Sequence, residues 1–307
     1  MNMLRREDGQ VTVLTAVFIV VLLGMAGFVI DVGSWFRQQR AVQSTVDSAA
    51  LAGVQALPGD PVNANALATT FAGKNGGVAG LNVTIKTKWK PNDMISVTQT
   101  QPSDGFFSKL FGISTVSLSA KASAVTAVPS AARFVAPIVV NIKHPDLSGP
   151  GCPCFNAPTT LDLGKTGAPG AFTLINLDNT DTTGTIGAST LADWIVKGYD
   201  KYLPLGQYFS DPGAKWNNST IQGAMQARYG TDLLFPVYDQ LINQGSNAEY
   251  HIIGWASFHL TNAYADGTSG TLTGYFTQVI WTGLLDQSGP SNPDIPDLGV
   301  HSVALID

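Results

Sequence analysis

An uninterrupted apolar run, Val11–Ile30, constrains this chain more than any other feature. Its 20 residues include no charged side chain and no Asn, Gln or Pro, and its only hydroxyl side chains are Thr12 and Thr15. A helix of this length covers roughly 30 Å, the thickness of the hydrocarbon core of a bilayer. A buried core helix is usually only about 11–12 residues long and carries a polar stripe. The run therefore predicts a membrane-spanning helix.

A cleaved signal peptide is the alternative for this run. Arg5 and Arg6 would suit the positively charged start of such a peptide. However, the run is longer than the roughly 7–15 residues of a signal peptide's apolar region, and no A-x-A cleavage site closes it. We therefore expect an uncleaved single-pass anchor.

Helical periodicity continues beyond the apolar run. Small or apolar residues recur at steps of three and four, and Pro58 then breaks the pattern; these residues are Val42, Val46, Ala49, Ala50, Gly53 and Leu57. Gln39 and Gln43 lie on the opposite face. One helix from about Val11 to about Leu57 would be about 70 Å long.

Small residues along this helix are candidate packing and assembly positions. The stripe of Ala49, Ala50 and Gly53 favours close approach by a neighbouring helix or by the protein's own sheet. Within the apolar run, Gly24 and Gly27 leave room for another helix, although their spacing is not that of the GxxxG motif.

Asp31 follows the apolar run directly. We expect it at the outer interface of the membrane, where a carboxylate stays hydrated.

Residues 58–128 predict a small α+β domain. Asp60 can cap a second helix that begins at Pro61, and Gly76 can end it. Alternating apolar and polar residues over Val83–Trp89 then predict a strand, and two further strands follow, the last ending near Val128.

Residues 129–307 predict a second, strand-rich α+β domain. Ser189 or Thr190 can cap a helix that continues through Tyr202, and several strand patterns follow it. The fold class is therefore α+β: a long helix over residues 1–57, then the two domains.

Charge is distributed unevenly. Residues 1–132 have a formal net charge of +3 and residues 133–307 a formal net charge of −8. Charged residues make up only 13% of the chain, which suits an extracytoplasmic, strand-rich protein. The acidic half argues against a nucleic-acid partner, because phosphate binding needs clustered Lys and Arg.

Motifs for catalysis, metals and cofactors are absent from the sequence. Both cysteines lie in one loop, where Cys152 and Cys154 form a disulfide or stay free, and two thiolates alone do not complete a tetrahedral zinc site. His251 and His259 share a strand face but lie roughly 26 Å apart along it. No HExxH or GxSxG motif occurs. We expect no catalytic residue, no metal site and no cofactor.

Two other functions stay open. Aromatic residues gather between residues 194 and 216, where they would form either core or a surface for a protein or glycan ligand: Trp194, Tyr199, Tyr202, Tyr208, Phe209 and Trp216. The many carboxylates of the acidic half would suit an envelope hydrolase.

Several N-terminal segments together resemble the start of TadG-like Flp pilus-assembly proteins. They are Gly9-Gln10, the apolar run, Asp31-Val32-Gly33 and the segment Ala41–Gly53, AVQSTVDSAALAG. The resemblance covers roughly residues 5–57. It implies a bacterial envelope protein of the tight-adherence pilus machinery, with its N-terminus in the cytoplasm, a pilin-like small domain outside, and a structural role for Asp47. The implied partners are the lipid bilayer and other Tad-type assembly proteins or pseudopilins.

Two departures from this resemblance matter. Flp prepilins and pseudopilins carry Glu five residues after the cleaved Gly, whereas Leu14 stands at that distance from Gly9, so we expect residues 1–9 to be retained. Many TadG-like proteins also carry a von Willebrand A domain with an Asp-x-Ser-x-Ser metal motif, which this sequence lacks. We therefore expect a non-catalytic membrane protein that works in assembly or adhesion.

Overall fold

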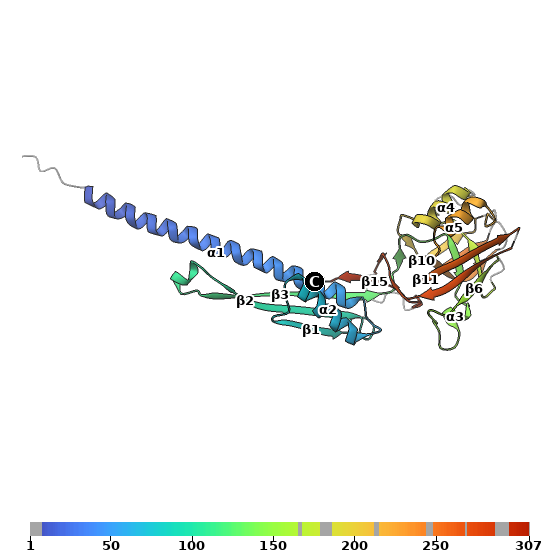
Figure 1. Ribbon diagram of the computed structural model, residues 1–307, viewed down its shortest axis with the longest axis horizontal. Coiled ribbons are helices and arrows are strands. Elements are labelled where there is room, and N and C mark those ends of the chain that lie inside the picture. The colour runs from blue at the N-terminus through green and yellow to red at the C-terminus, as the bar shows by residue number, and fades with distance from the viewer. Residues whose placement is uncertain are drawn as a thin grey trace, which may run out of the picture. The chain divides into compact units, whose positions relative to one another are not determined.

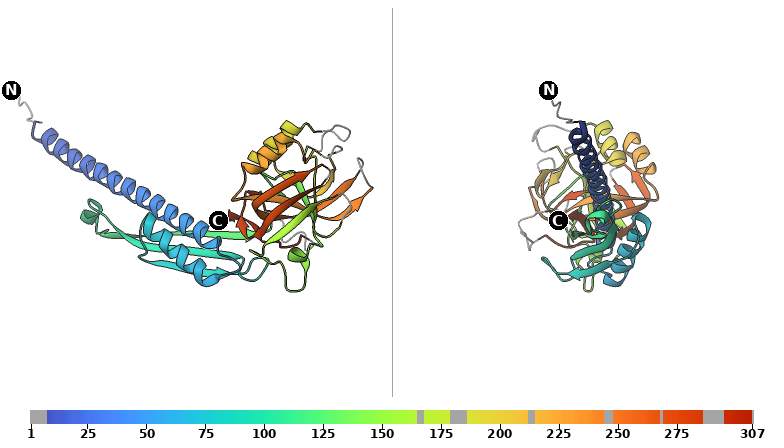
Figure 2. Two further views of the ribbon diagram at one scale, coloured as in Figure 1. Left: turned by 45° about the vertical axis from the view of Figure 1, so that its right-hand side comes forward. Right: turned by 90° about the vertical axis from the view of Figure 1, so that its left-hand side faces the viewer.

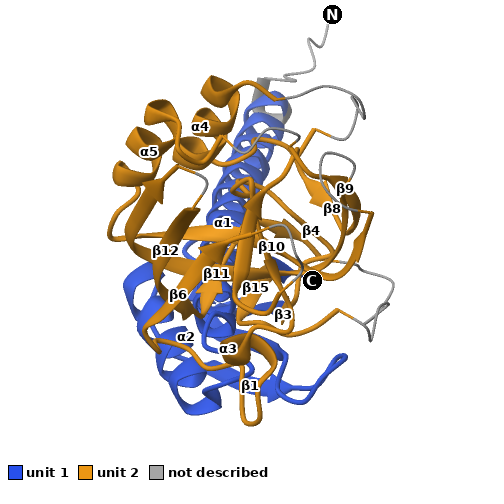
Figure 3. Cartoon of the chain, turned by 90° about the vertical axis from the view of Figure 1, so that its right-hand side faces the viewer, with its two compact units in different colours: residues 1–125, 304–307 blue, residues 126–303 orange. Residues whose placement is uncertain are grey.

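The computed structural model describes residues 8–164, 168–178, 186–211, 215–243, 248–267, 269–285 and 295–306. The chain forms two compact units, residues 1–125 with 304–307 (unit 1) and residues 126–303 (unit 2) (Figure 3). Both units combine helices and strands, so the α+β fold class is confirmed. The finer boundaries expected at residues 57 and 128 stay predictions. Arg5 and Arg6 lie outside the described residues.

Unit 1 begins with one continuous helix, α1 (Asp8–Val54), whose 47 residues give a length of about 70 Å (Figure 1). The large apolar side chains between Val11 and Ile30 are mostly exposed. The helix is long and apolar enough to cross a membrane. The predicted continuous helix is confirmed, and it ends three residues before Leu57.

A second helix, α2 (Pro61–Asn75), packs on the last turns of α1, and its caps are those that the sequence predicts. The Asp60 carboxylate accepts a hydrogen bond from the Asn63 N–H at 2.9 Å, and the N–H of Gly76 bonds the Ala72 carbonyl at the other end. Its alanine face, formed by Ala64, Ala68 and Ala72, is buried.

Three antiparallel strands complete most of unit 1: β1 (Leu81–Lys86), β2 (Met94–Asp104) and β3 (Thr115–Ala127). Figure 2 shows α2 and these strands along the second half of α1. The first strand is shorter than the predicted range to Trp89. The reason is Asp93, whose carboxylate accepts hydrogen bonds from the N–H groups of residues 88, 89 and 90 and folds that segment into the turn.

Unit 2 is built on a ring of six strands. The ring is closed because β10 pairs with both β5 and β11; in order its members are β10 (Thr231–Ile242), β5 (Ile138–Asn141), β7 (Ala171–Leu174), β6 (Thr159–Leu163), β12 (Ser269–Thr277) and β11 (Glu249–Asp266). A seventh strand, β9 (Gly206–Phe209), pairs with one end of β11.

Short strands accompany the ring. Three of them form a small sheet: β14 (Gly283–Leu284), β4 (Ala131–Ala132) and β8 (Leu203–Pro204). In addition, β13 (Val279–Ile280) pairs in parallel with β15 (Val300–Leu305).

The described residues of unit 2 include three helices: α3 (Pro145–Ser148), α4 (Ala188–Lys197) and α5 (Ser219–Gln226). The predicted caps and end of α4 are wrong. The helix is preceded by Gly187 and stops at Lys197, because Gly198 adopts a φ of 78° and donates its N–H to the Trp194 carbonyl. The predicted continuation to Tyr202 is therefore replaced by an isolated bridge between Tyr199 and Val135, followed by a bend.

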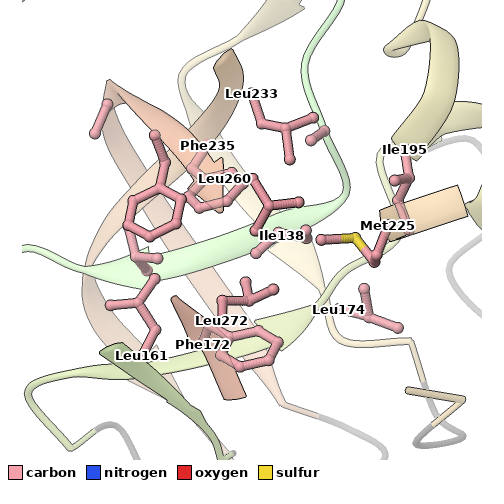
Figure 4. Packing of buried hydrophobic residues seen from close by; sticks show 14 of the residues in the cluster. Ile138, Leu161, Phe172, Leu174, Ile195, Met225, Leu233, Phe235, Leu260 and Leu272 are labelled. Carbon is pink, nitrogen blue, oxygen red and sulfur yellow. The ribbon is translucent and has the colours of Figure 1, made fainter. Parts of the chain in front are cut away.

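The inside of unit 2 is a close-packed apolar core to which both the ring and the helices contribute (Figure 4). Ile195 and Met225 from the helices lie beside Ile138 and Leu174 from the strands. The aromatic group between residues 194 and 216 is largely core as well, since Tyr199, Tyr208 and Trp216 are all buried.

Candidate functional site along the first helix

The hairpin between β2 and β3 carries an apolar tip that lies beside the first half of α1 (Figure 1). We call residues 105–113 the aromatic tip; it includes the short 3-10 helix η1 (Ser108–Phe111). Its most exposed side chains are Phe106, at 77%, and Leu110, at 84%, followed by Phe111 and Ile113. Such a concentration of exposed apolar side chains marks a surface that a further molecule covers.

Asp31 holds this tip against α1. Its Oδ2 atom accepts hydrogen bonds from the N–H of Phe106 at 3.0 Å and from the N–H of Ser108 at 2.6 Å. The residue is only 3% exposed. The expectation of a hydrated Asp31 is therefore wrong, because the backbone amides of the tip take the place of water.

Gly24 and Gly27 make room for the rings of the tip. A Cβ atom on Gly27 would lie 2.6 Å from Phe107 Cγ, and one on Gly24 would lie 3.4 Å from Phe111 Cζ. A Cβ atom on Gly33, two residues beyond Asp31, would have no neighbour within 4 Å. The space that the sequence assigned to another helix is thus occupied by the chain's own hairpin, and contact with a second helix stays a prediction.

An apolar groove of about 960 Å³ runs between α1 and the aromatic tip. One wall is the apolar run, including Val20, Val21 and Phe28, and the other is the tip, including Phe107 and Leu110. Neither wall offers a charged side chain to a ligand, so the groove suits hydrocarbon or an apolar side chain.

The alanine stripe faces the inside of unit 1. Ala49 and Ala50 are fully buried, and a Cβ on Gly53 would lie 2.5 Å from Ile95 Cδ1 and 2.8 Å from the Ala64 carbonyl oxygen. Of the two partners that the sequence left open, the protein's own sheet and second helix occupy the stripe. A role of these residues in assembly stays a prediction.

Asp47 belongs to a row of polar contacts on another face of α1. Its carboxylate accepts a hydrogen bond from Gln43 Nε2 at 2.8 Å, and the same nitrogen lies 3.2 Å from the Lys121 carbonyl oxygen. One turn earlier, Gln39 donates to the Ser119 carbonyl at 2.7 Å. Sequence reasoning placed both glutamines on the polar face but missed that they bind the backbone of β3; their spacing of four residues was the available signal.

The chemical groups of unit 2 form pairs. Cys152 and Cys154 form a disulfide. Each of the four histidines contacts one carboxylate, and the two shortest pairs are 2.8 Å apart, His251 with Asp239 and His259 with Asp232. Among the residues that the structure describes, no three His, Cys, Asp or Glu side chains come close enough to hold a metal ion.

Comparison with known proteins agrees with the geometry of α1. Residues 9–56 match the family described as "Putative Flp pilus-assembly TadE/G-like". Neither a curated protein nor a solved structure matches the chain. The matched residues coincide almost completely with α1, from the apolar run to the end of the alanine stripe. The N-terminal region of this chain is therefore a Tad domain of the TadE/G-like Flp pilus-assembly family.

Proposed function

We propose that this protein is a non-catalytic, membrane-anchored component of the Flp pilus assembly machinery, with its N-terminus in the cytoplasm and both units outside. One observation carries the proposal. The residues that match the Tad family form a single helix whose first half is apolar and exposed and whose second half packs on α2 and β2 within unit 1. The anchor and the first folded unit are thus one continuous element.

Because α1 is continuous, the anchor also determines how unit 1 is held at the membrane. A flexible linker would let a tethered domain sample many positions above a membrane. Here the helix passes without a break from the apolar run into the core of unit 1, so inserting the helix also fixes the height and tilt of unit 1. Such an arrangement suits a part that other assembly proteins or pseudopilins must meet at a defined distance from the bilayer.

The two alternative functions have less support. A ligand-binding surface rested on the aromatic group in unit 2, and the rings of Tyr199, Tyr208 and Trp216 serve the core. A hydrolase rested on paired carboxylates, whereas the ion pairs among the described residues of unit 2 each join a carboxylate to His, Lys or Arg. We propose no second function.

Pilus counts test the proposal. Deleting the gene should abolish or strongly reduce Flp pili seen by electron microscopy, and the full-length chain supplied in trans should restore them. After shearing, the protein should stay with the membrane fraction. Unchanged pilus numbers in the deletion strain would contradict a role in assembly.

Topology has its own test. Protease added to intact cells, after any outer layers are opened, should degrade residues 60–307 and spare the anchor. Complete protection of that region would contradict the outside-facing arrangement.

A further inference from the structure

We propose that the aromatic tip is a second membrane contact, which enters the leaflet nearest to unit 1 alongside α1 and is held there by Asp31. This inference rests on the anchoring by α1 in the proposed function. The ligand is the lipid itself, at the level of the headgroups and the upper acyl chains.

The position of the tip along α1 sets its depth. Asp31 binds the start of the tip, Gly27 contacts Phe107, and Gly24 contacts Phe111. Gly24 precedes Asp31 by seven residues, which corresponds to about 10 Å along a helix. Because Val11–Ile30 covers the thickness of the hydrocarbon core, a tip fixed beside Gly24 lies below the membrane surface.

The side chains of the tip suit that depth. Phe106, Leu110, Phe111 and Ile113 are exposed in the folded unit, and together with the apolar run they form one continuous apolar surface. Phe and Leu side chains on the apolar face of interfacial helices enter the boundary between headgroups and acyl chains by about 5–10 Å. Lys109, the cation in η1, has a stem long enough to place its ammonium among lipid phosphates while its neighbours stay in the apolar region.

Much of the backbone of the tip is hydrogen-bonded within the protein, which lowers the cost of placing this loop in lipid. An unsatisfied N–H or C=O group in hydrocarbon costs several kcal/mol, so loops rarely enter it. Here the N–H groups of residues 105, 110, 112 and 113 all bond to carbonyls within the hairpin. The Ser108 hydroxyl bonds the Ile113 carbonyl. Asp31 then accepts from the N–H groups of Phe106 and Ser108.

Lipid is favoured over a second copy of the chain as the molecule that covers the tip. The groove beside the tip is lined by Val20, Val21 and Phe28, which belong to the same run that the bilayer must cover. Any lipid around that run therefore reaches the tip without a further binding event. A second copy would have to displace this lipid from an apolar surface that gains little by the exchange.

Depth-dependent quenching in vesicles tests the inference. The full-length protein carries Cys152→Ser and Cys154→Ser, one new cysteine and an environment-sensitive fluorophore, and it is reconstituted in phosphatidylcholine–phosphatidylglycerol vesicles. Nitroxide lipids place the quencher near the headgroup or near the chain end. Labels at Leu110→Cys in the tip, Leu22→Cys in α1 and Asn92→Cys in the β1–β2 turn form a matched set.

We expect the label at position 110 to be quenched by the shallow nitroxide, like a lipid-exposed site, while the label at 92 stays in water. If the label at 22 is quenched and the one at 110 remains in water, the tip inference fails and the anchor stands. If the label at 22 is not quenched, the anchor of the proposed function fails and the inference fails with it. A label at 110 that is shielded from water but not quenched would show a protein cover and overturn the lipid assignment.

A second pair of variants tests the docking of the tip on α1. Gly27→Ala places a methyl group against Phe107, whereas Gly33→Ala enters open space on the same helix. We expect Gly27→Ala, but not Gly33→Ala, to cause a loss of shallow quenching at position 110. Equal quenching in both variants would overturn the proposed fixed depth.

Discussion

The packing around Gly53 in unit 1 leads to a specific prediction for the stability of the Gly53→Ala variant. Alanine is a better helix former than glycine, so Gly53→Ala in the last turn of α1 should by itself add at most about 1 kcal/mol of stability. The structure opposes this gain. The new methyl group would lie 2.5 Å from Ile95 Cδ1, 2.8 Å from the Ala64 carbonyl oxygen and 3.0 Å from Ala68 Cβ.

These three contacts decide whether Gly53→Ala stabilises or destabilises unit 1. Ile95 can rotate its terminal methyl group, but the Ala64 oxygen belongs to the backbone of α2 and moves only if that helix moves. Overpacking of this kind typically costs about 1–3 kcal/mol, and a fixed backbone atom places this site at the upper end. After the gain in helix propensity is subtracted, we expect unit 1 to lose about 1–2 kcal/mol.

Hydrogen exchange is the suitable assay, because a chain of two units need not unfold in one step. Protected amides in α2 and β2 of the full-length protein should exchange roughly 5–30 times faster in Gly53→Ala, the factor that corresponds to one or two kcal/mol. Amides in β10 and β11 should keep their rates.

Gly33→Ala is the matched control. It makes the same chemical change in the same helix, but its methyl group meets nothing within 4 Å. Unit 1 should therefore keep or slightly gain protection in this variant. If amides exchange equally fast or more slowly in Gly53→Ala than in Gly33→Ala, the reasoning is refuted. Small side chains would then not be required for the close approach of α1 and α2.

Three further predictions concern the N-terminus, a turn and a buried histidine. Because Leu14 stands where the prepilin peptidase expects Glu, mass spectrometry of the purified protein should find residues 1–9 retained, and a mature chain beginning at Gln10 would contradict this. Asp93→Ala should destabilise unit 1 by about 1–3 kcal/mol in hydrogen exchange, because it leaves three backbone N–H groups without their acceptor, and Asp93→Asn should lose less. Burial lowers the pKa of His144 despite the opposing charge of Asp146, so stability of unit 2 is complete above the ordinary histidine pKa of about 6.5 and falls as the pH drops below it. Thermal unfolding should show this loss, and His144→Asn, which can still accept the helix-capping hydrogen bond, should remove it.

Features set by neighbouring residues could be predicted from the sequence. The apolar run and the helical steps that follow it specify α1, and the pair Asp60 and Pro61 specifies the start of α2. These signals act within one or two turns, so they survive in any tertiary context. The prediction for the end of α4 is an exception. Gly198 is visible in the sequence, but the sequence does not show the positive φ with which it ends the helix.

Features set by distant residues could not be predicted. Asp31 lies 75 residues from Phe106, and no sequence pattern in either segment predicts their contact. The sequence does show a carboxylate directly after an apolar run, and it shows an aromatic loop, but only the hairpin geometry brings them together. The closed ring of unit 2 has the same character, because β10 pairs with the next strand, β11, and also with β5, from which residues 142–230 separate it in the sequence.

The chain order of unit 1 has a consequence for biosynthesis. Residues 304–306 belong to unit 1, where the Ile306 N–H bonds the Ser123 carbonyl at 2.8 Å, although all of unit 2 separates them in the sequence. During synthesis, β3 therefore presents an open edge until the whole of unit 2 has been made. Open edges are templates for pairing with other chains. A polypeptide interrupted anywhere within residues 126–303 would keep that edge open, whereas a chain that reaches residue 306 pairs with it.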